Sequence, residues 1–489
     1  MTQTNSQHNR PLLEKIARDT MHERGLLTDF PAAVISELQC IKGPASGDGL
    51  KDLRALAWCS IDNDDSRDLD QLSVAVPGDD GNVKILVALA DVDALVRKGS
   101  QIDLHAQHNT TSVYTAAEIF PMLPEKLSTD LTSLNYHTDR VAVIVEIVLD
   151  QDAVVQASDV YRAFVRNQAR LSYKSVAGWL EGKGKMPEVI GTVSGLDENI
   201  KLQYQLAAKL KQQRHLQGAL NLDTVKAKPI FEGDEITELE EERRNIAKDI
   251  IEDFMIAANG VTAKYLSAKN FPSIRRVVRE PERWDRIVQL AAEHHYTLPA
   301  TPDSKALDQF LVKAREADYL RFPDISLSVL KLLGSGEYSV EVPGGAHTGH
   351  FGLAVRDYAH STAPNRRYPD LITHRLLKAA IAGEPVPYTV EELKVLAAHC
   401  SKSENASRKV ERQVGKSASA ILFQQKIGEE FQAIVTGASA KGTWVRTLHP
   451  PVDGRLNQPA KDIDVGDEIR VKLEHVDIKR GFIDFREVK

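Results

Sequence analysis

The sequence predicts a mixed α+β protein made of a small helical module, one large domain and a terminal β-barrel. Apolar residues recur at helical spacing in 11–27 and 31–41, short β-rich runs alternate with long helical stretches through the middle of the chain, and the final segment alternates in hydropathy between glycines. This combination is typical of the α+β class. We place the three parts at residues 1–48, 49–426 and 427–489.

The first part contains two predicted helices separated by Gly25 and a turn at Thr28–Pro31. Two arrangements are open for it: a helix-turn-helix, or a helical hairpin packed on the main domain. Residues 42–49, KGPASGDG, are turn-forming and predict a linker.

The large part mixes strands and long helices. Runs such as Val83–Ala90 and Val141–Leu149 predict strands. Helical spacing predicts helices at 199–215, 238–266, 370–382 and 391–423. In the last part, strands of a small barrel are expected at 431–435, 443–447, 468–475 and 481–485.

Composition narrows the class of protein. The chain of 489 residues is 42% apolar and 27% charged, which allows a full core. Its three cysteines, Cys40, Cys59 and Cys400, form no CxxC and indicate neither a disulfide framework nor a thiolate zinc site. We therefore expect the protein to lie in the reducing cytoplasm. The sequence has no apolar stretch long enough for a membrane span, so no association with a membrane is expected. We also expect a monomer. The net charge of -7 argues against a protein that coats nucleic acid by overall positive charge, but a local basic surface remains open. Residues 402–416 could form such a surface, or they could be an ordinary solvated helix face.

An acidic run at Ser60–Gln71 concentrates five carboxylates within nine positions. In an extended stretch Asp68 and Asp70 share a face, and Asp62 could return to them across a turn. Oxygen ligands alone point to Mg²⁺, Mn²⁺ or Ca²⁺. An EF-hand is excluded, because Arg67 stands at the glycine position and Ser73 at the glutamate position. Taken alone, an acidic run of this kind is more often solvated surface than a metal site.

A second segment changes that balance. It runs from His347 to Arg375 and contains STAPNRRYPDL followed by His374. Together the two segments resemble the signatures of the ribonuclease II and ribonuclease R family, IDxxxxxDxDD and HFTSPIRRYPDLxxHR. Further matches to that family lie at Thr111–Tyr114, Phe120–Pro124, Leu131–Leu134, Arg214–Leu222, Ile251–Asn259 and Val410–Val414.

The resemblance implies a magnesium-dependent 3′-to-5′ exoribonuclease that trims single-stranded RNA with a free 3′ end to 5′-mononucleotides. The large part would then be an RNB-type catalytic domain, and the last part an OB-fold RNA-binding barrel of the ribosomal S1 type. Mn²⁺ is a possible substitute for Mg²⁺.

Residue roles follow from the same resemblance. Asp70, Arg366 and Asp68 match catalytic positions, and the metal positions are Asp62, Asp68, Asp70 and Gln71. Arg366 would stabilise developing negative charge. The expected RNA-binding positions are Tyr114, Leu222, Glu252, Glu411 and Tyr368.

Three departures from the family pattern qualify these roles. Gln71 replaces a fourth aspartate, so it offers an oxygen without charge. Leu222 stands where a second stacking aromatic is usual. The fifty N-terminal residues are too few for the usual cold-shock barrels, which implies a more open entrance that admits structured RNA.

Two other functions stay open at this stage. The first is an RNA-binding protein that keeps the fold but has lost catalysis through Gln71. The second is a metal hydrolase of small phosphoesters, for which Tyr114 and the barrel would be dispensable. A zinc site at the histidines 347, 350, 360 and 374 is not expected, because no cysteine lies nearby.

Overall fold

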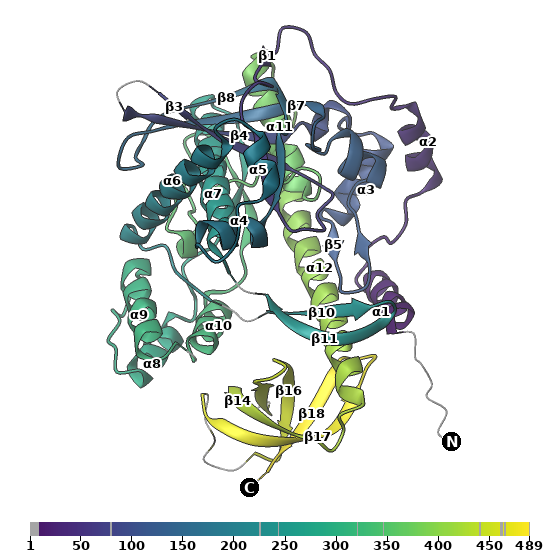
Figure 1. The fold of residues 1–489 in the computed structure, drawn as a ribbon, viewed down its shortest axis with the longest axis vertical. Coiled ribbons are helices and arrows are strands. Elements are labelled where there is room, and N and C mark those ends of the chain that lie inside the picture. Colours follow the sequence, from purple (N-terminus) through teal and green to yellow (C-terminus); the bar gives the residue numbers. More distant parts are fainter. Residues whose placement is uncertain are drawn as a thin grey trace.

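The computed structural model describes residues 9–78, 81–223, 226–242, 244–319, 321–345, 347–439, 442–459, 463 and 466–488. Its centre is a seven-stranded sheet in the order β1-β8-β7-β4-β3-β2-β9 (Figure 1). The strands are β1 (Lys51–Asp52), β2 (Cys59–Asp62), β3 (Gln71–Pro77), β4 (Val83–Ala90), β7 (Asp139–Leu149), β8 (Val155–Arg166) and β9 (Ala169–Ser172). β3, β4, β7 and β8 pair antiparallel, whereas β2 runs parallel to β9 and β1 parallel to β8. The mixed α+β class is confirmed.

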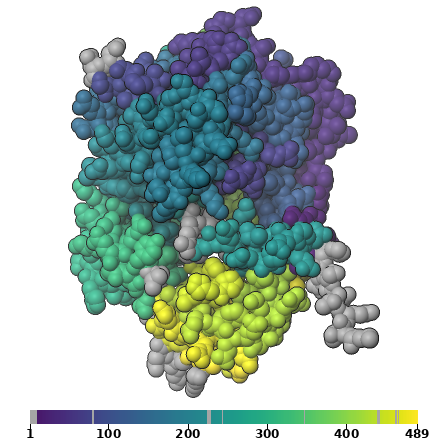
Figure 2. All heavy atoms as spheres, viewed as in Figure 1, coloured from purple at the N-terminus to yellow at the C-terminus, as the bar shows by residue number. Residues whose placement is uncertain are grey.

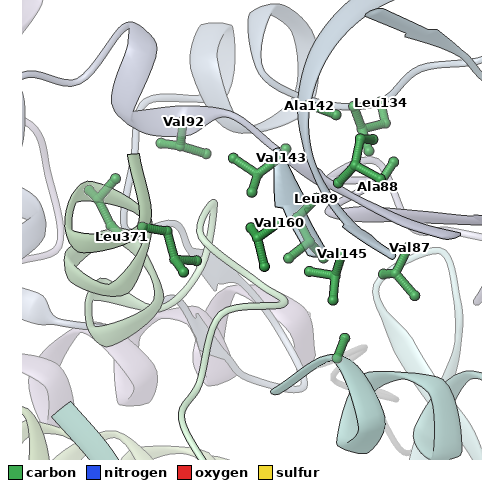
Figure 3. Packing of buried hydrophobic residues seen from close by; sticks show 14 of the residues in the cluster. Val87, Ala88, Leu89, Val92, Leu134, Ala142, Val143, Val145, Val160 and Leu371 are labelled. Carbon is green, nitrogen blue, oxygen red and sulfur yellow. The ribbon is translucent and has the colours of Figure 1, made fainter. Parts of the chain in front are cut away.

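The main core lies between this sheet and helices on its face. β4 reads VKILVALA and β7 DRVAVIVEIVL, and these nearly continuous apolar runs are buried, as expected for central strands covered on both faces. Figure 3 shows side chains of β4, β7 and β8, such as Val143 and Val160, beside Leu371 of α11 (Tyr368–Ala382). Burying this cluster fixes α11 to the sheet.

The remaining elements surround the sheet. The helices are α3 (Gln101–Asn109), α4 (Tyr173–Leu180), α5 (Glu188–Thr192), α6 (Leu196–Leu216), α7 (Ile246–Ala268), α8 (Trp284–Glu293), α9 (Ser304–Ala317) and α10 (Phe322–Leu333). Short turns of helix lie at Val92–Ala94, Lys126–Leu131 and Phe351–Leu353. Three ribbons complete the large part: β5 (Val113–Tyr114) with β6 (Ile119–Phe120), β10 (Lys226–Glu232) with β11 (Glu235–Glu242), and β12 (Ser273–Val277) with β13 (Glu337–Glu341).

One helix predicted at 238–266 is partly wrong. Residues 235–242 form β11, which pairs antiparallel with β10, and α7 begins only at Ile246. The glutamates of β11 favour a helix by propensity. Burial of Ile236 and Leu239 in two apolar clusters overrides that preference and holds the segment as a strand.

Helix α12 (Val390–Gln424) links the parts of the molecule (Figure 1). It starts with a capping box, in which the Thr389 hydroxyl accepts from the backbone N–H of Glu392, whose carboxylate accepts from the Thr389 N–H. Its buried face contacts β13 near the start, α1 in the middle and the terminal barrel at the end. No helix in the described part of the chain has both the length and the apolar character needed to cross a membrane.

The terminal part is a closed barrel in the order β14-β15-β16-β18-β17. Its strands are β14 (Glu430–Ser439), β15 (Gly442–Thr447), β16 (Asp453–Asn457), β17 (Glu468–Asp477) and β18 (Phe482–Glu487). Figure 2 shows the yellow barrel below the teal β10–β11 ribbon and beside the green α8–α10 segment. Arg446 of β15 reaches Asp324 of α10 at 3.3 Å, and both side chains are nearly buried. This ion pair ties the barrel to the large part.

The N-terminal helices α1 (Asn9–Glu23) and α2 (Ala32–Cys40) both pack on the large part. Leu13, Ile16 and Met21 of α1 join an apolar cluster with α12, and Val34 of α2 joins the main core. α1 packs on α12 and α2 on α3, and the two helices lie apart (Figure 1). Both helices pack on the large part, but they form neither the helix-turn-helix nor the helical hairpin expected from the sequence, because the chain between them crosses to a different apolar cluster. The three domain boundaries given above remain a prediction.

The stability of α11 depends on a buried ion-pair network. Arg375 is almost fully buried and donates to Asp93, Asp103, the Tyr388 hydroxyl and the Val96 carbonyl, each at 2.8 Å. Arg375→Ala leaves two carboxylates without this partner, so we expect a loss of about 3–5 kcal/mol in the free energy of unfolding. Urea unfolding of the two proteins measures the difference.

Arg97→Ala, at an exposed arginine next to Val96, is the matched control and should change the free energy of unfolding by less than about 0.5 kcal/mol. Equal stability of the Arg375→Ala and Arg97→Ala variants would contradict the role given to this network.

Candidate active site

Asp70 lies at the entrance to β3 and is 1% exposed. One carboxylate oxygen accepts from the backbone N–H of Asn365, and the other from Nε of Arg366, both at 3.0 Å. The two segments are separated by 296 positions in the sequence. The structure therefore brings together the acidic run and Arg366, which lie in two separate sequence motifs.

The loop before α11 is held rigidly enough to present this contact. Asp370 accepts from the backbone N–H of Ala363 at 2.8 Å and from Nη2 of Arg367 at 2.7 Å. Pro369 occupies the first turn of α11, where its missing N–H is not needed. Of the two neighbouring arginines, Arg367 therefore stiffens the loop, whereas Arg366 faces Asp70.

Asp62 and Asp68 approach the same place from the acidic run. Asp62 ends β2, beside Ser172 of β9, and Asp68 accepts from the hydroxyl of Tyr114 at 2.7 Å. The charge of Arg366 acts to lower the pKa of Asp62, and the charge of Asp68 acts to raise the pKa of Arg366, so all three side chains lie close enough to interact. Gln71 follows as the first residue of β3 and is 9% exposed.

Burial sets the electrostatics of the site. It raises the pKa of Asp70 to about 7, with Asp68 adding to the effect and Arg366 opposing it. Burial also raises the pKa of Asp62. For Arg366 burial lowers the pKa, but the nearby Asp70, Tyr114 and Asp68 outweigh burial, so its pKa lies above the ordinary value. The guanidinium is therefore a permanent charge with 41% of its side chain accessible.

The donor set fits a hard divalent cation. All three acids offer carboxylate oxygens, which are the ligands that hard divalent cations prefer. Burial is the main cause of the raised pKa values of Asp62 and Asp70, and it disfavours their charged forms. The oxygens of the three acids do not form a set of three within 4.8 Å of one another. Asp68 and Asp70 are instead engaged by Tyr114 and Arg366.

Tyr114 lies on the two-residue strand β5, with its side chain partly exposed. Its backbone N–H donates to Oε1 of Glu411 on α12 at 3.1 Å. Two of the predicted RNA-binding residues therefore touch each other, and Tyr114 also touches the acidic run. A partly exposed ring fixed at both ends is suited to stack on a nucleobase.

Three further predicted RNA-binding residues are not brought into contact with Asp70 or Arg366 by any described interaction. Glu252 on α7 pairs with Arg244 at 2.6 Å. Leu222 packs against the apolar cluster of α8–α10. Tyr368 is 1% exposed and packs in the main core, so the predicted RNA contact at Tyr368 requires a correction: the first turn of α11 directs this ring inward.

Two neighbours of the site carry little or no signal in the sequence. The backbone N–H of Asn365 binds Asp70, and its adjacency to Arg366 was the only signal in the sequence. Tyr173 begins α4, and burial together with the nearby Asp62 raises its pKa. A single tyrosine at the start of a helix carried no signal.

One other group of potential metal ligands lies elsewhere among the described residues. Atoms of Glu341, His347 and Asp357 lie within 4.8 Å of one another. Arg275 already pairs with Glu341 at 2.8 Å and lies 4.0 Å from Asp357. The guanidinium supplies the positive charge, so this group is an ion-pair network.

The family of the chain is visible in two matched regions. Residues 50–383 match the RNB domain, and residues 429–488 match the RNase II-type exonuclease C-terminal S1 domain. Ribonuclease R of Aquifex aeolicus is 30% identical over 495 residues, covering 94% of this chain and 68% of that protein. Ribonuclease R of Escherichia coli is 29% identical, covering 89% of this chain and 57% of that protein. The chain thus spans little more than half of some relatives.

Solved structures show the same fold. The structure of Mycoplasma genitalium RNase R in complex with ribose-methylated single-stranded RNA has a TM-score of 0.87 at 23% identity and covers 98% of this chain and 78% of that one. Yeast Ssd1, described as a pseudonuclease, has a TM-score of 0.70 at 16% identity, covering 96% and 57%. With the RNB match over more than half of its length, the chain belongs to the RNB family of ribonuclease II and ribonuclease R proteins.

Proposed function

We propose that this protein is a 3′-to-5′ exoribonuclease that hydrolyses single-stranded RNA to 5′-mononucleotides. The observation that carries the proposal is the ion pair between the buried Asp70 and the partly exposed Arg366, with Asp62, Asp68 and the ring of Tyr114 around it. Carboxylates that can hold a cation, a fixed guanidinium and an aromatic ring are the parts that phosphodiester hydrolysis at an RNA end requires.

Nucleases of the RNB family depend on a divalent metal ion in general. Here Asp62, Asp68 and Asp70 would hold it, with the Gln71 amide oxygen as a neutral addition. Mg²⁺ is the ion we propose, and Mn²⁺ a substitute that Gln71 favours. When bound, such an ion neutralises phosphate charge and activates water for attack.

The remaining steps belong to the side chains of the protein. Arg366 keeps its charge and offers guanidinium N–H groups beside Asp70, where negative charge develops on the phosphate. Tyr114 holds a base near the 3′ end without reading its sequence. Glu411, and Glu252 if the RNA reaches it, would accept hydrogen bonds from ribose hydroxyls and so separate RNA from DNA.

The proposed substrate is RNA, and the proposed location is the cytoplasm. Mycoplasma genitalium RNase R has been solved with single-stranded and with double-stranded RNA. We propose that this chain acts on single-stranded RNA with a free 3′ end, as a monomer, and admits structured RNA. A cytoplasmic setting fits the three cysteines, which are all free thiols.

The alternative is an RNA-binding protein that has kept the fold and lost hydrolysis. Yeast Ssd1 combines this fold with the description of a pseudonuclease, so fold alone does not decide between the two. Comparing nucleotide release and RNA binding by the wild type and by Asp70→Asn separates the two.

Asp70→Asn should abolish catalysis and leave RNA binding. The amide keeps the shape but removes the buried charge, so we expect release of 5′-mononucleotides from labelled oligo(A) to fall by roughly 10³-fold or more. The Kd for the same oligonucleotide, measured by fluorescence anisotropy, should change less than about threefold. Asp65→Asn, in the same loop but 75% exposed, is the control and should retain activity. A wild type that binds RNA but is as inactive as Asp70→Asn would favour the RNA-binding alternative.

Tyr114→Ala should weaken the hold on the RNA end. Because a base stacked on an aromatic ring contributes about 1–3 kcal/mol, we expect KM for oligo(A) to rise about tenfold or more. Tyr114→Phe keeps the ring but loses the bond to Asp68, so its KM should stay near that of the wild type. Steady-state kinetics of the two variants give the comparison. Equal KM for Tyr114→Ala and the wild type would remove the stacking role.

The stability of the metal-free protein should depend on pH through Asp70. Its pKa of about 7 in the folded state lies above the ordinary value of 3.8, so the native state binds more protons than the unfolded state between these limits. The free energy of unfolding should therefore rise as pH falls from 7 to 4, by up to about 1.4 kcal/mol per pH unit from this group. Urea unfolding in EDTA measures it.

The Asp70→Asn variant is the reference for this dependence, because it lacks the titrating group. Its profile should be flatter between pH 4 and 7, and added Mg²⁺ should stabilise only the wild type at pH 8. Identical pH profiles of the two proteins would show that Asp70 does not titrate with a raised pKa.

A further inference from the structure

Helix α1 lies between two ribbons that border the acidic run. Its apolar face shares a cluster with Val113 and Phe120 of the β5–β6 ribbon, with Ile236 of β11 and with α12. At its start, the backbone N–H of Arg10 donates to the Asp234 carbonyl in the β10–β11 turn at 3.0 Å. The helix therefore joins three elements, one of which carries Tyr114.

Arg18 is the polar link from α1 to the β5–β6 ribbon. Its Nη2 donates to Oε1 of Glu118 at 2.5 Å, and its Nη1 lies 3.2 Å from Asp29. The guanidinium also lies 5.7 Å from the ring centre of Phe120. These contacts fix one arginine against both the ribbon and the segment that follows α1.

Glu118 is close to Tyr114 within the same ribbon. Tyr114 pairs with Ile119, and the turn between them is closed by the Thr115 N–H, which donates to the Glu118 carbonyl at 3.1 Å. A ribbon of two-residue strands is not stable alone. Holding Glu118 from α1 therefore restricts the motion of the segment that presents the Tyr114 ring.

We infer that Arg18 of α1 is a positioning residue that preorganises the Tyr114 ribbon for the RNA end, which gives the N-terminal helix a role in substrate binding. The inference rests on the proposed function. Without the Arg18 link, RNA binding must itself order the ribbon, and the entropy cost of that ordering lowers the affinity for RNA. The hydrolysis step at Asp70 is unaffected, because Arg18 does not contact Asp70.

The test is a double-mutant cycle between Arg18 and Tyr114 in the full-length protein. Arg18→Ala should raise KM for oligo(A) about three- to fivefold with kcat nearly unchanged. In the Tyr114→Ala background the same substitution should have no further effect, because the ring it positions is gone. Glu118→Gln approaches the link from its other end and should reproduce the Arg18→Ala effect. Lys15→Ala, which removes only an exposed pair with Asp19 on the same helix, is the control.

The outcomes are distinguishable. A KM effect that persists at full size in the Tyr114→Ala background, or an Arg18→Ala protein identical to Lys15→Ala, overturns the inference. Should the wild type release no nucleotide, the proposed function fails, and the same cycle is read from the Kd for oligo(A) by fluorescence anisotropy. Non-additive Kd values would still support the positioning role, and additive values would overturn it.

Discussion

One buried carboxylate organises this molecule. Burial removes the Asp70 carboxylate from water, which costs free energy when the group is charged. The backbone N–H of Asn365 and the guanidinium of Arg366, from the far end of the RNB domain, offset this cost by donating hydrogen bonds to it. That contact requires the start of β3 to lie beside the loop that precedes α11. The sheet, the apolar face of α11 and the buried network of Arg375 all serve to hold this meeting point.

A second set of contacts holds Tyr114 beside the acidic residues. Helix α12 supplies Glu411 to the backbone of Tyr114, and α1 packs against both α12 and the β5–β6 ribbon. Thus the polar centre comes from the sheet and its loops, whereas the aromatic ring that we propose contacts RNA comes from a short strand held by helices. The barrel joins the same frame through Arg446 and Asp324.

Sequence reasoning reached the parts of this arrangement that are local. Alternating or continuous apolar runs located the central strands and the barrel, and two dense motifs located Asp70 and Arg366. It failed where tertiary contacts decide. A glutamate-rich segment became β11 because Ile236 and Leu239 are buried, and Tyr368 turned into the core because of its place in the first turn of α11. Nor could spacing show that Glu252 pairs with Arg244, since that contact depends on how α7 meets the loop before it.

The most direct test of the account is a crystal structure of Asp70→Asn with a bound oligo(A) and Mn²⁺. The account predicts the phosphodiester nearest the 3′ end against the guanidinium of Arg366, a base on the ring of Tyr114, and metal density at Asp62 and Asp68. An RNA end bound away from Arg366, or a metal held only at Glu341 and His347, would contradict it.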